Sequence, residues 1–84
     1  MFYVYVLKSE RDRDLYIGYT EDLKRRLGEH NGGANKSIKS RKPFVLIYYE
    51  AYRDKSDAII RERRLKQFKN SYSELRKRIV KSIR

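Results

Sequence analysis

The chain has 84 residues, 22 of them Lys or Arg and 11 Asp or Glu, and its formal net charge of +11 favours a polyanionic partner. Nucleic acid is the first candidate, an anionic membrane surface the second, and a merely soluble basic protein the bland alternative. With no cysteine and one histidine, disulfides and multi-histidine zinc sites are excluded, and no apolar stretch suits a membrane span or a signal peptide, so a cytoplasmic location is expected.

Two apolar segments near the start of the chain predict a pair of strands. Residues 2–7 are apolar on both faces, which is typical of a strand that is covered on both sides. The charged residues 9–14 predict a hairpin loop, and residues 15–19 predict a second strand. Because the loop is short, the two strands are expected to be antiparallel.

The two strands carry tyrosines and a glycine whose roles the pattern leaves open. Tyrosines in strands commonly pack in a core. A phenol beside cationic groups would instead have its pKa lowered from about 10 and could take a proton from water. Gly18 would let a phosphate or another backbone approach closely, or it would form a bulge. The tyrosines concerned are Tyr3, Tyr5, Tyr16 and Tyr19.

A helix is predicted from Thr20, as its N-cap, to about residue 29, where an Asn-Gly-Gly stop follows. Arg26 on its inner face can extend its charge to the surface, or it can bind an anion in a cleft with its planar fork. His30 can simply interact with the terminal carbonyls of the helix. The residues at i, i+3, i+4 and i+7 on this face are Leu23, Arg26, Leu27 and His30.

Residues 35–42 predict a basic loop, and residues 44–52 predict a third strand that is apolar on both faces. The loop is expected to contact nucleic-acid phosphates, and the alternative is a solvated loop. Its candidate phosphate-binding residues are Lys36, Lys39, Arg41 and Lys42.

Two basic helices are predicted after the third strand. Asp54 or Ser56 is expected to cap the first, which runs to about residue 69. Ser71 and Glu74 have the spacing of a capping box that opens the second. The order ββα-βαα predicts an α+β fold in which three helices flank a small, mainly antiparallel three-stranded sheet, within a single domain of residues 1–84.

Glu62 lies on the apolar stripe of the first of these two helices, beside Ala58 and Leu65. A carboxylate in such a place raises the free energy of the fold unless it is paired or holds a metal ion. An ion pair with a neighbouring arginine is the structural alternative. Glu62 is therefore a candidate metal ligand, and its position alone does not decide between a metal site and an ion pair.

Taken together, these residues resemble the GIY-YIG nuclease family. The resemblance runs through YVY at residues 3–5, YIG at residues 16–18, DLKRRL at residues 22–27 with the following His-Asn, and AIIRERRLK at residues 58–66. It covers most of the chain, and in length the chain is similar to the small stand-alone bacterial members. Tyr3 stands where the family name has glycine. Asn70 is a candidate for a further asparagine of the family, but its segment is also typical of a helix-to-helix turn.

The resemblance implies an endonuclease that hydrolyses DNA phosphodiester bonds. Tyr16 would be the general base and Tyr5 would position it. Arg26 would stabilise charge on the scissile phosphate, and His30 would support proton transfer or phosphate contact. Glu62 would anchor one divalent ion, Mg²⁺ or Mn²⁺. We expect Tyr16, Arg26 and Glu62 to meet around one pocket that is open to solvent.

Two other functions are compatible with the sequence. A non-catalytic module that recognises DNA or RNA structure would account for the charge, because phosphate contacts dominate affinity for nucleic acid. A transferase that uses Tyr16 as a nucleophile would leave a covalent protein–DNA adduct. Loss of metal-dependent cleavage in a Glu62→Ala variant that still binds nucleic acid would separate the nuclease from the binding module.

Overall fold

The computed structural model of the chain describes residues 1–32 and 39–84. Three strands form one antiparallel sheet in the order β2-β1-β3. The α+β fold with a small antiparallel sheet that the sequence predicted is therefore confirmed. The strands are β1 (Phe2–Ser9), β2 (Leu15–Thr20) and β3 (Phe44–Tyr52).

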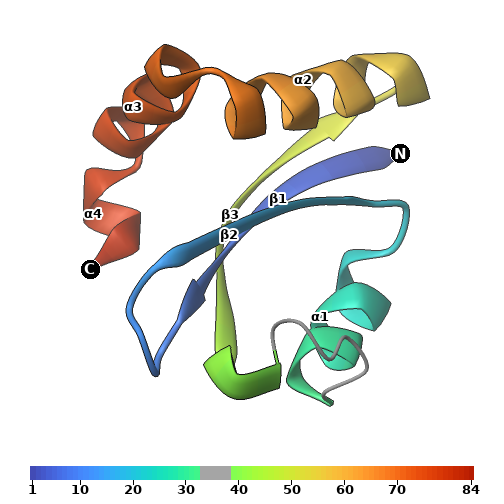
Figure 1. Cartoon of the computed structure of the whole chain (residues 1–84). Helices are drawn as coiled ribbons and strands as arrows, with labels where there is room; N and C mark the ends of the chain where they lie inside the picture. Colours follow the sequence, from blue (N-terminus) through green and yellow to red (C-terminus); the bar gives the residue numbers. More distant parts are fainter. Residues whose placement is uncertain (33–38) are drawn as a thin grey trace.

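The helices cover both faces of this sheet, as Figure 1 shows. Helix α1 (Leu23–Asn31) lies on one face, and α2 (Lys55–Gln67) and α3 (Lys69–Arg78) lie on the other. A short η1 (Lys39–Arg41) precedes β3, and a short α4 (Val80–Ile83) ends the chain. No helix in the described part of the chain is long and apolar enough to cross a membrane.

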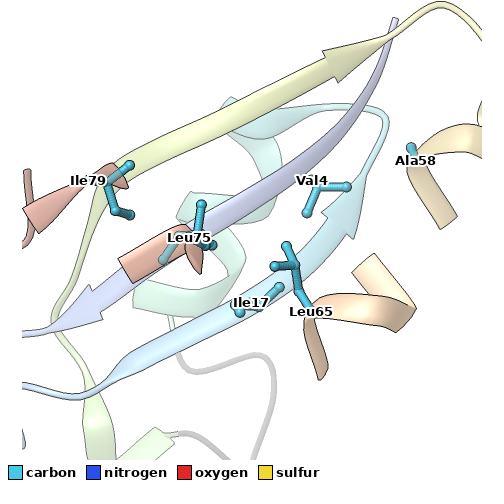
Figure 2. Close-up of a cluster of buried hydrophobic side chains, with 7 residues drawn as sticks. Val4, Ile17, Ala58, Leu65, Leu75 and Ile79 are labelled. Atoms are coloured by element: carbon cyan, nitrogen blue, oxygen red, sulfur yellow. The ribbon is translucent and has the colours of Figure 1, made fainter. Parts of the chain in front are cut away.

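The larger core cluster fills the space between the sheet and helices α2 and α3. Val4 and Val6 of β1 point to this side because alternate residues of a strand face opposite ways. Figure 2 shows the side chains of this cluster between the sheet and the helices, with Leu65 close to Val4 and Ile17. The buried residues of this cluster are Val4, Val6, Ile17, Ala58, Leu65, Leu75 and Ile79.

A second core cluster lies on the other face, between the sheet and α1. It contains Tyr5 and Leu7 of β1 with Phe44 of β3, and Leu23 and Leu27 of α1 pack against it. The two clusters explain why residues 2–7 are apolar at every position: β1 is the central strand, and both of its faces are covered. The side of α1 is the one that carries Tyr5.

The start of α1 differs from the prediction by two residues. The Asp22 side chain caps the helix by accepting a hydrogen bond of 3.0 Å from the backbone N–H of Arg25. Thr20 instead remains the last residue of β2, and its hydroxyl bonds to the backbone of Asp22. Thr20 therefore shapes the strand-to-helix turn. The Asp22 carboxylate satisfies the backbone N–H group of Arg25 in the first turn of α1.

The predicted capping box at Ser71 and Glu74 is wrong. Helix α2 ends at Gln67, Phe68 adopts an extended backbone, and α3 begins at once with Lys69. Ser71 and Glu74 therefore lie inside α3, where the carboxylate of Glu74 is 3.4 Å from Nζ of Lys77. The predicted cap of α2 is confirmed for Asp54, which accepts a hydrogen bond from the backbone N–H of Ser56.

Candidate active site at the edge of the sheet

Tyr5 is the central residue of the candidate site. Its side chain is buried on the α1 side of β1, opposite Gly18 of β2, and its hydroxyl lies 2.9 Å from Nε2 of His30. Burial raises the pKa of Tyr5 above 10, the charges of Tyr16 and Glu62 raise it further, and the neighbouring Arg26 guanidinium offsets this only in part. Tyr5 is therefore a neutral phenol at neutral pH, which corrects our expectation that cationic neighbours would lower its pKa.

His30 occupies the last turn of α1 and is buried beneath it, with 1% of its surface exposed. Burial, and then the charge of Arg26, lower the pKa of His30, so the imidazole is neutral at neutral pH. The Tyr5 hydroxyl and Nε2 of His30 share one hydrogen bond, whose direction depends on the tautomer of the imidazole. Nδ1 of His30 has no partner among the described residues.

Arg26 projects from α1 with one third of its side chain exposed. Its NH1 atom lies 3.0 Å from the Glu29 carboxylate one turn later, and its guanidinium also lies beside the Tyr5 hydroxyl. These two contacts fix the guanidinium at the end of a buried Tyr–His pair while leaving part of it open to solvent. This arrangement is suited to receiving an anion, because the charge is already oriented.

Tyr16 lies on the outer strand β2 and is only half-buried. Its ring centroid is 4.9 Å from that of His30 and 6.5 Å from that of Tyr5. Nζ of Lys66, from α2, lies 6.0 Å from the same ring centroid. Tyr16 is therefore the more accessible of the two tyrosines and connects the buried cluster to α2.

Glu62 reaches the same region from the opposite face of the sheet. Its carboxylate is 3.0 Å from Nζ of Lys66, and 21% of its side chain is exposed. It is also close enough to Tyr5 to raise the pKa of that phenol. Because β2 is an outer strand, residues of α2 can reach around its free edge toward side chains that face α1.

Four of the predicted catalytic residues gather on the α1 side of the sheet, around Tyr5, which is the common neighbour of Tyr16, Arg26 and His30. Glu62 approaches this group through Lys66, which lies beside Tyr16. Arg26 lines an open depression of about 520 Å³ beside the start of α1, whereas Tyr16 lines another with Lys66. A single pocket shared by Tyr16, Arg26 and Glu62 stays a prediction.

Gly18 is required by Tyr5. A Cβ atom at this position would lie 2.3 Å from the Tyr5 hydroxyl oxygen and 2.4 Å from Cζ. The space in which we expected a phosphate or another backbone is thus filled by the tyrosine itself. The alternative prediction for Gly18 was a bulge. The irregularity in the sheet lies instead between Val6 and Leu7, where β1 pairs with β3.

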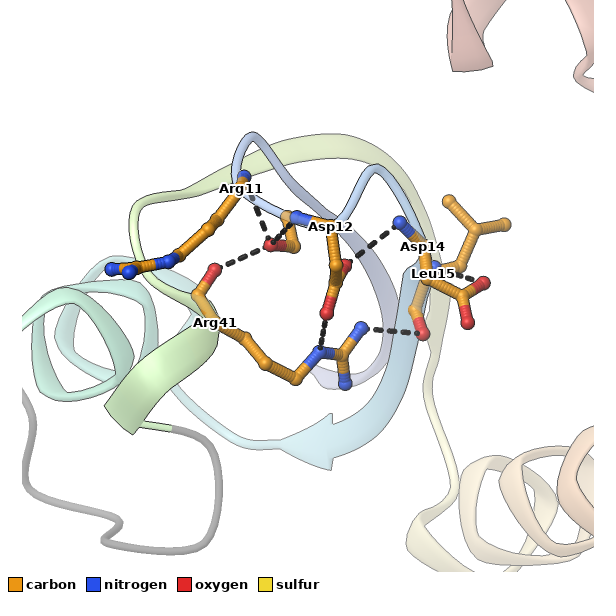
Figure 3. A network of polar contacts seen from close by, with 6 residues as sticks. Arg11, Asp12, Asp14, Leu15 and Arg41 are labelled. Atoms are coloured by element: carbon orange, nitrogen blue, oxygen red, sulfur yellow. Dashed lines mark hydrogen bonds and ion pairs between the residues drawn. The ribbon is translucent and has the colours of Figure 1, made fainter.

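Arg41 is engaged in holding the hairpin turn to η1. Its Nε atom donates to Asp12 at 2.7 Å, which lowers the pKa of that carboxyl, and one terminal nitrogen donates to the Leu15 carbonyl. Figure 3 shows these contacts together with the polar turn at Arg11. Buried Ser9 joins the network by donating to the Arg41 carbonyl. Arg41 thus has a structural role, and the predicted phosphate contact would be additional.

The other predicted phosphate-binding residues lie near the same segment. Lys42 is half-buried before Pro43, and Lys39 begins η1. Lys36 lies outside the described residues. Their contacts with nucleic acid remain predictions.

Two residues of the site were given no role from the sequence. Asn31 clamps the end of α1 to β3: its side chain donates to the Phe44 carbonyl at 3.0 Å and accepts from the Phe44 N–H at 2.6 Å. Asn31 belonged to the family resemblance and to a helix stop signal, but neither indicated a contact with β3. Lys66 stands four residues after Glu62, a spacing that predicts an ion pair on a helix, yet its approach to Tyr16 depends on the tertiary fold.

Glu62 fits a divalent ion only as a partial ligand set. In the part of the chain that the structure describes, no three His, Cys, Asp or Glu side chains gather into a metal cage. Mg²⁺ needs no such cage, because it keeps several waters and is bound by one or two carboxylates with substrate phosphates. The Glu62 carboxylate is paired with the ammonium group of Lys66, so a metal ion bound there would have to displace this group or bind against its charge.

Fold and site together define a small α+β domain in which tyrosine, arginine, histidine and glutamate side chains gather at one edge of a three-stranded sheet. A family model described as the GIY-YIG catalytic domain matches residues 1–78, and the chain belongs to the GIY-YIG family.

Relatives with similar sequences are named only as UPF0213 proteins. The chain is 43% identical to one from Staphylococcus haemolyticus over 67 residues, which cover 79% of this chain and 80% of the relative. It is 40% identical to one from Halobacterium salinarum over 75 residues, covering 88% of this chain and 96% of the relative. It is 46% identical to one from Streptococcus agalactiae over 66 residues, which cover 77% of this chain and 74% of the relative. No solved structure matches the chain.

Proposed function

We propose that the chain is a metal-dependent endonuclease that hydrolyses DNA phosphodiester bonds. The observation that carries the proposal is the set of neighbours around Tyr5: a hydrogen bond to His30, the Arg26 guanidinium, the Tyr16 ring and the charge of Glu62. Membership of the GIY-YIG family supports the same reaction class. With a charge of +11, the chain is also suited to a polyanionic substrate.

Arg26 would bind a non-bridging oxygen of the scissile phosphate. Its guanidinium is held in place by Glu29 and Tyr5, so little reorganisation is needed as negative charge develops in the transition state. Its exposure leaves room for the substrate. Truncation of Arg26 to alanine should therefore lower the cleavage rate by about 10²- to 10³-fold.

Tyr16 would be the proton acceptor. A water molecule attacks phosphorus, its proton passes to the Tyr16 oxygen as the phenol proton of Tyr16 passes to solvent, and the bond from phosphorus to the leaving ester oxygen breaks, with that oxygen taking a proton from solvent. Tyr16 suits this step because it is half-exposed, whereas Tyr5 is buried and remains neutral. Tyr5 and His30 would hold Tyr16 and Arg26 in position from below.

Glu62 would hold Mg²⁺ or Mn²⁺, and an ion bound there supplies charge stabilisation at the phosphoryl and leaving oxygens. Its carboxylate is partly exposed, so an ion could reach it from solvent. Water and the substrate phosphate would complete the ligand set. We also propose that the protein works in the cytoplasm, as a chain without cysteine can.

The experiment is a cleavage assay on duplex, branched and single-stranded DNA and on RNA, each with Mg²⁺ or with EDTA. The proposal predicts cleavage of at least one DNA substrate with Mg²⁺ and none with EDTA. Tight binding without cleavage of any substrate would favour the binding module instead. A DNA strand that stays attached to the protein in a denaturing gel would indicate that Tyr16 acts as a nucleophile.

A further inference from the structure

A depression lies away from the candidate active site, between α2 and α3. It has a volume of about 640 Å³ and is open to solvent. Three of its lining residues, Arg61, Lys77 and Arg78, are cationic, and one, Glu74, is anionic. Glu74 is paired with Lys77, so the two arginines account for the net positive charge of the lining residues.

Arg61 is held rigidly at the floor of this depression. Its Nε and NH2 atoms donate to the two carboxylate oxygens of Glu50 on β3, at 2.9 and 3.1 Å. Only 28% of the Arg61 side chain and 14% of the Glu50 side chain is exposed. A guanidinium has five N–H donors, and only one edge of the fork is used by Glu50. The remaining edge is preorganised for a second anion.

The network behind Arg61 also reaches Arg78. Glu50 accepts hydrogen bonds from the hydroxyls of Tyr48 and Tyr52, and Arg78 lies beside the Tyr48 hydroxyl. Burial alone would raise the pKa of Glu50, but Arg61 and the two hydroxyls together lower it, so the carboxylate stays charged. The half-buried Glu50 carboxylate thus fixes the Arg61 guanidinium, and Arg78 lines the same depression near the Tyr48 hydroxyl. The nuclease mechanism uses none of these residues.

Arg61 and Glu62 are neighbours in sequence but serve opposite sides of α2. Arg61 contacts β3, one outer strand of the sheet, while Glu62 and Lys66 approach Tyr16 on β2, the other outer strand. A phosphate at Arg61 is therefore not the one that Arg26 and Glu62 would hold.

We infer that the depression between α2 and α3 is a second phosphate-binding site, in which Arg61 and Arg78 hold a phosphodiester of the nucleic acid away from the cleavage point. This rests on the proposed nucleic-acid substrate. Paired guanidinium groups suit a phosphodiester because each can donate two parallel hydrogen bonds to its oxygens. The nucleic acid would then contact the protein on both sides of α2.

Arg78 is the residue to change, because truncating Arg61 would leave the Glu50 carboxylate without its cation. Binding of Arg78→Gln to a fluorescent duplex DNA would be measured in EDTA, between about 50 and 200 mM salt. Arg11→Gln is the matched control, since it removes the same charge from an exposed position of the hairpin turn. We expect the slope of log affinity against log salt to fall by about 0.9 in Arg78→Gln and to stay unchanged in Arg11→Gln.

Equal slopes for wild type and Arg78→Gln, or equal losses in both variants, would overturn the inference. A second arm titrates inorganic phosphate, against chloride at equal ionic strength, and follows the backbone amides of α3 by NMR. Shifts in wild type that Arg78→Gln abolishes, together with the change of slope, support the site. Shifts without a change of slope would identify a site for free phosphate and contradict a nucleic-acid role. Cleavage by wild type at low salt tests the proposed function separately.

Discussion

The hydroxyl of Tyr5 occupies the space above Gly18 that any other residue at position 18 would fill with its own side chain. The two residues face each other on β1 and β2. Tyr5 has little freedom to move away, because its ring packs beside those of Tyr16 and His30. The glycine thereby fixes where the Tyr5 hydroxyl meets Arg26 and His30.

Replacement of Gly18 by alanine should therefore displace Tyr5. We expect Gly18→Ala to lower the free energy of unfolding by about 1–3 kcal/mol, as overpacking does, and to reduce cleavage. Gly28→Ala is the matched control, because a Cβ there meets no atom within 4 Å. Alanine in that helix should raise stability by about 0.5–1 kcal/mol. Urea unfolding measures both, and equal stability of the two variants would contradict the packing of Tyr5 against Gly18.

The buried imidazole of His30 predicts a loss of stability on mild acidification. Burial and Arg26 lower its pKa below 6.5 in the folded state. As the pH falls below 6.5, the unfolded chain takes up a proton that folded His30 refuses, so the free energy of unfolding decreases until the lowered pKa is reached. The decrease approaches about 1.4 kcal/mol per pH unit for one such group.

Urea unfolding of wild type and His30→Gln at several values between about pH 7.5 and 5.5 tests this dependence. Glutamine can keep a hydrogen bond to Tyr5 but does not titrate, so the variant should show a flatter profile. The same slope in both proteins would assign the pH dependence to other groups.

The carboxylate of Glu50 should contribute strongly to stability because it holds Arg61 and two tyrosines. Burial, and then the hydrogen bond to Glu50, raise the pKa of Tyr52 to about 12. We expect Glu50→Ala to lower the free energy of unfolding by about 2–4 kcal/mol, since it leaves a half-buried guanidinium without its partner. Glu74→Ala, which removes an exposed partner of Lys77, should change it by less than about 1 kcal/mol. Similar losses from both substitutions would show that the Glu50 network is not a stabilising centre.

The proximity of Lys66 to Glu62 predicts competition between the ammonium group and a divalent ion. Nζ lies 3.0 Å from the carboxylate, so a metal ion at Glu62 must displace it or bind against its charge. We expect Lys66→Gln to bind Mn²⁺ about 2- to 5-fold more tightly than wild type. Lys24→Gln removes the same charge from an exposed position of α1 and should bind as wild type does. Calorimetric titration measures the affinities, and an unchanged affinity in Lys66→Gln would place the ion elsewhere.

The sequence predicted most of the fold because its local signals agree with the tertiary structure. The doubly apolar β1, the polar turn and the cap at Asp54 are each determined by neighbouring residues. The start of α3 could not be predicted, because it depends on the extended conformation of Phe68 between two helices. Ser71 and Glu74 have the spacing of a capping box, but both residues lie inside α3, which begins at Lys69.

The candidate site shows the same division between local and tertiary information. Tyr5, Arg26 and His30 could be found by strand and helix periodicity. The filling of the space above Gly18 by Tyr5 could not, because it depends on the register of β1 and β2. The pKa of Tyr5 was expected to fall from its charged neighbours, yet burial under α1 dominates. The structural role of Arg41 likewise could not be predicted, because its partner Asp12 lies on a distant segment of the chain.

The most direct test of the nuclease proposal compares wild type, Glu62→Gln and the control Glu10→Gln on a cleavable DNA substrate with Mg²⁺. Glu62→Gln keeps the shape of the side chain but removes the charge that would hold the ion, whereas Glu10→Gln removes the same charge from an exposed position of the hairpin turn. We predict that cleavage falls at least about 100-fold in Glu62→Gln, while DNA binding in EDTA and the activity of Glu10→Gln stay at wild-type level. Undiminished cleavage by Glu62→Gln would contradict the proposal.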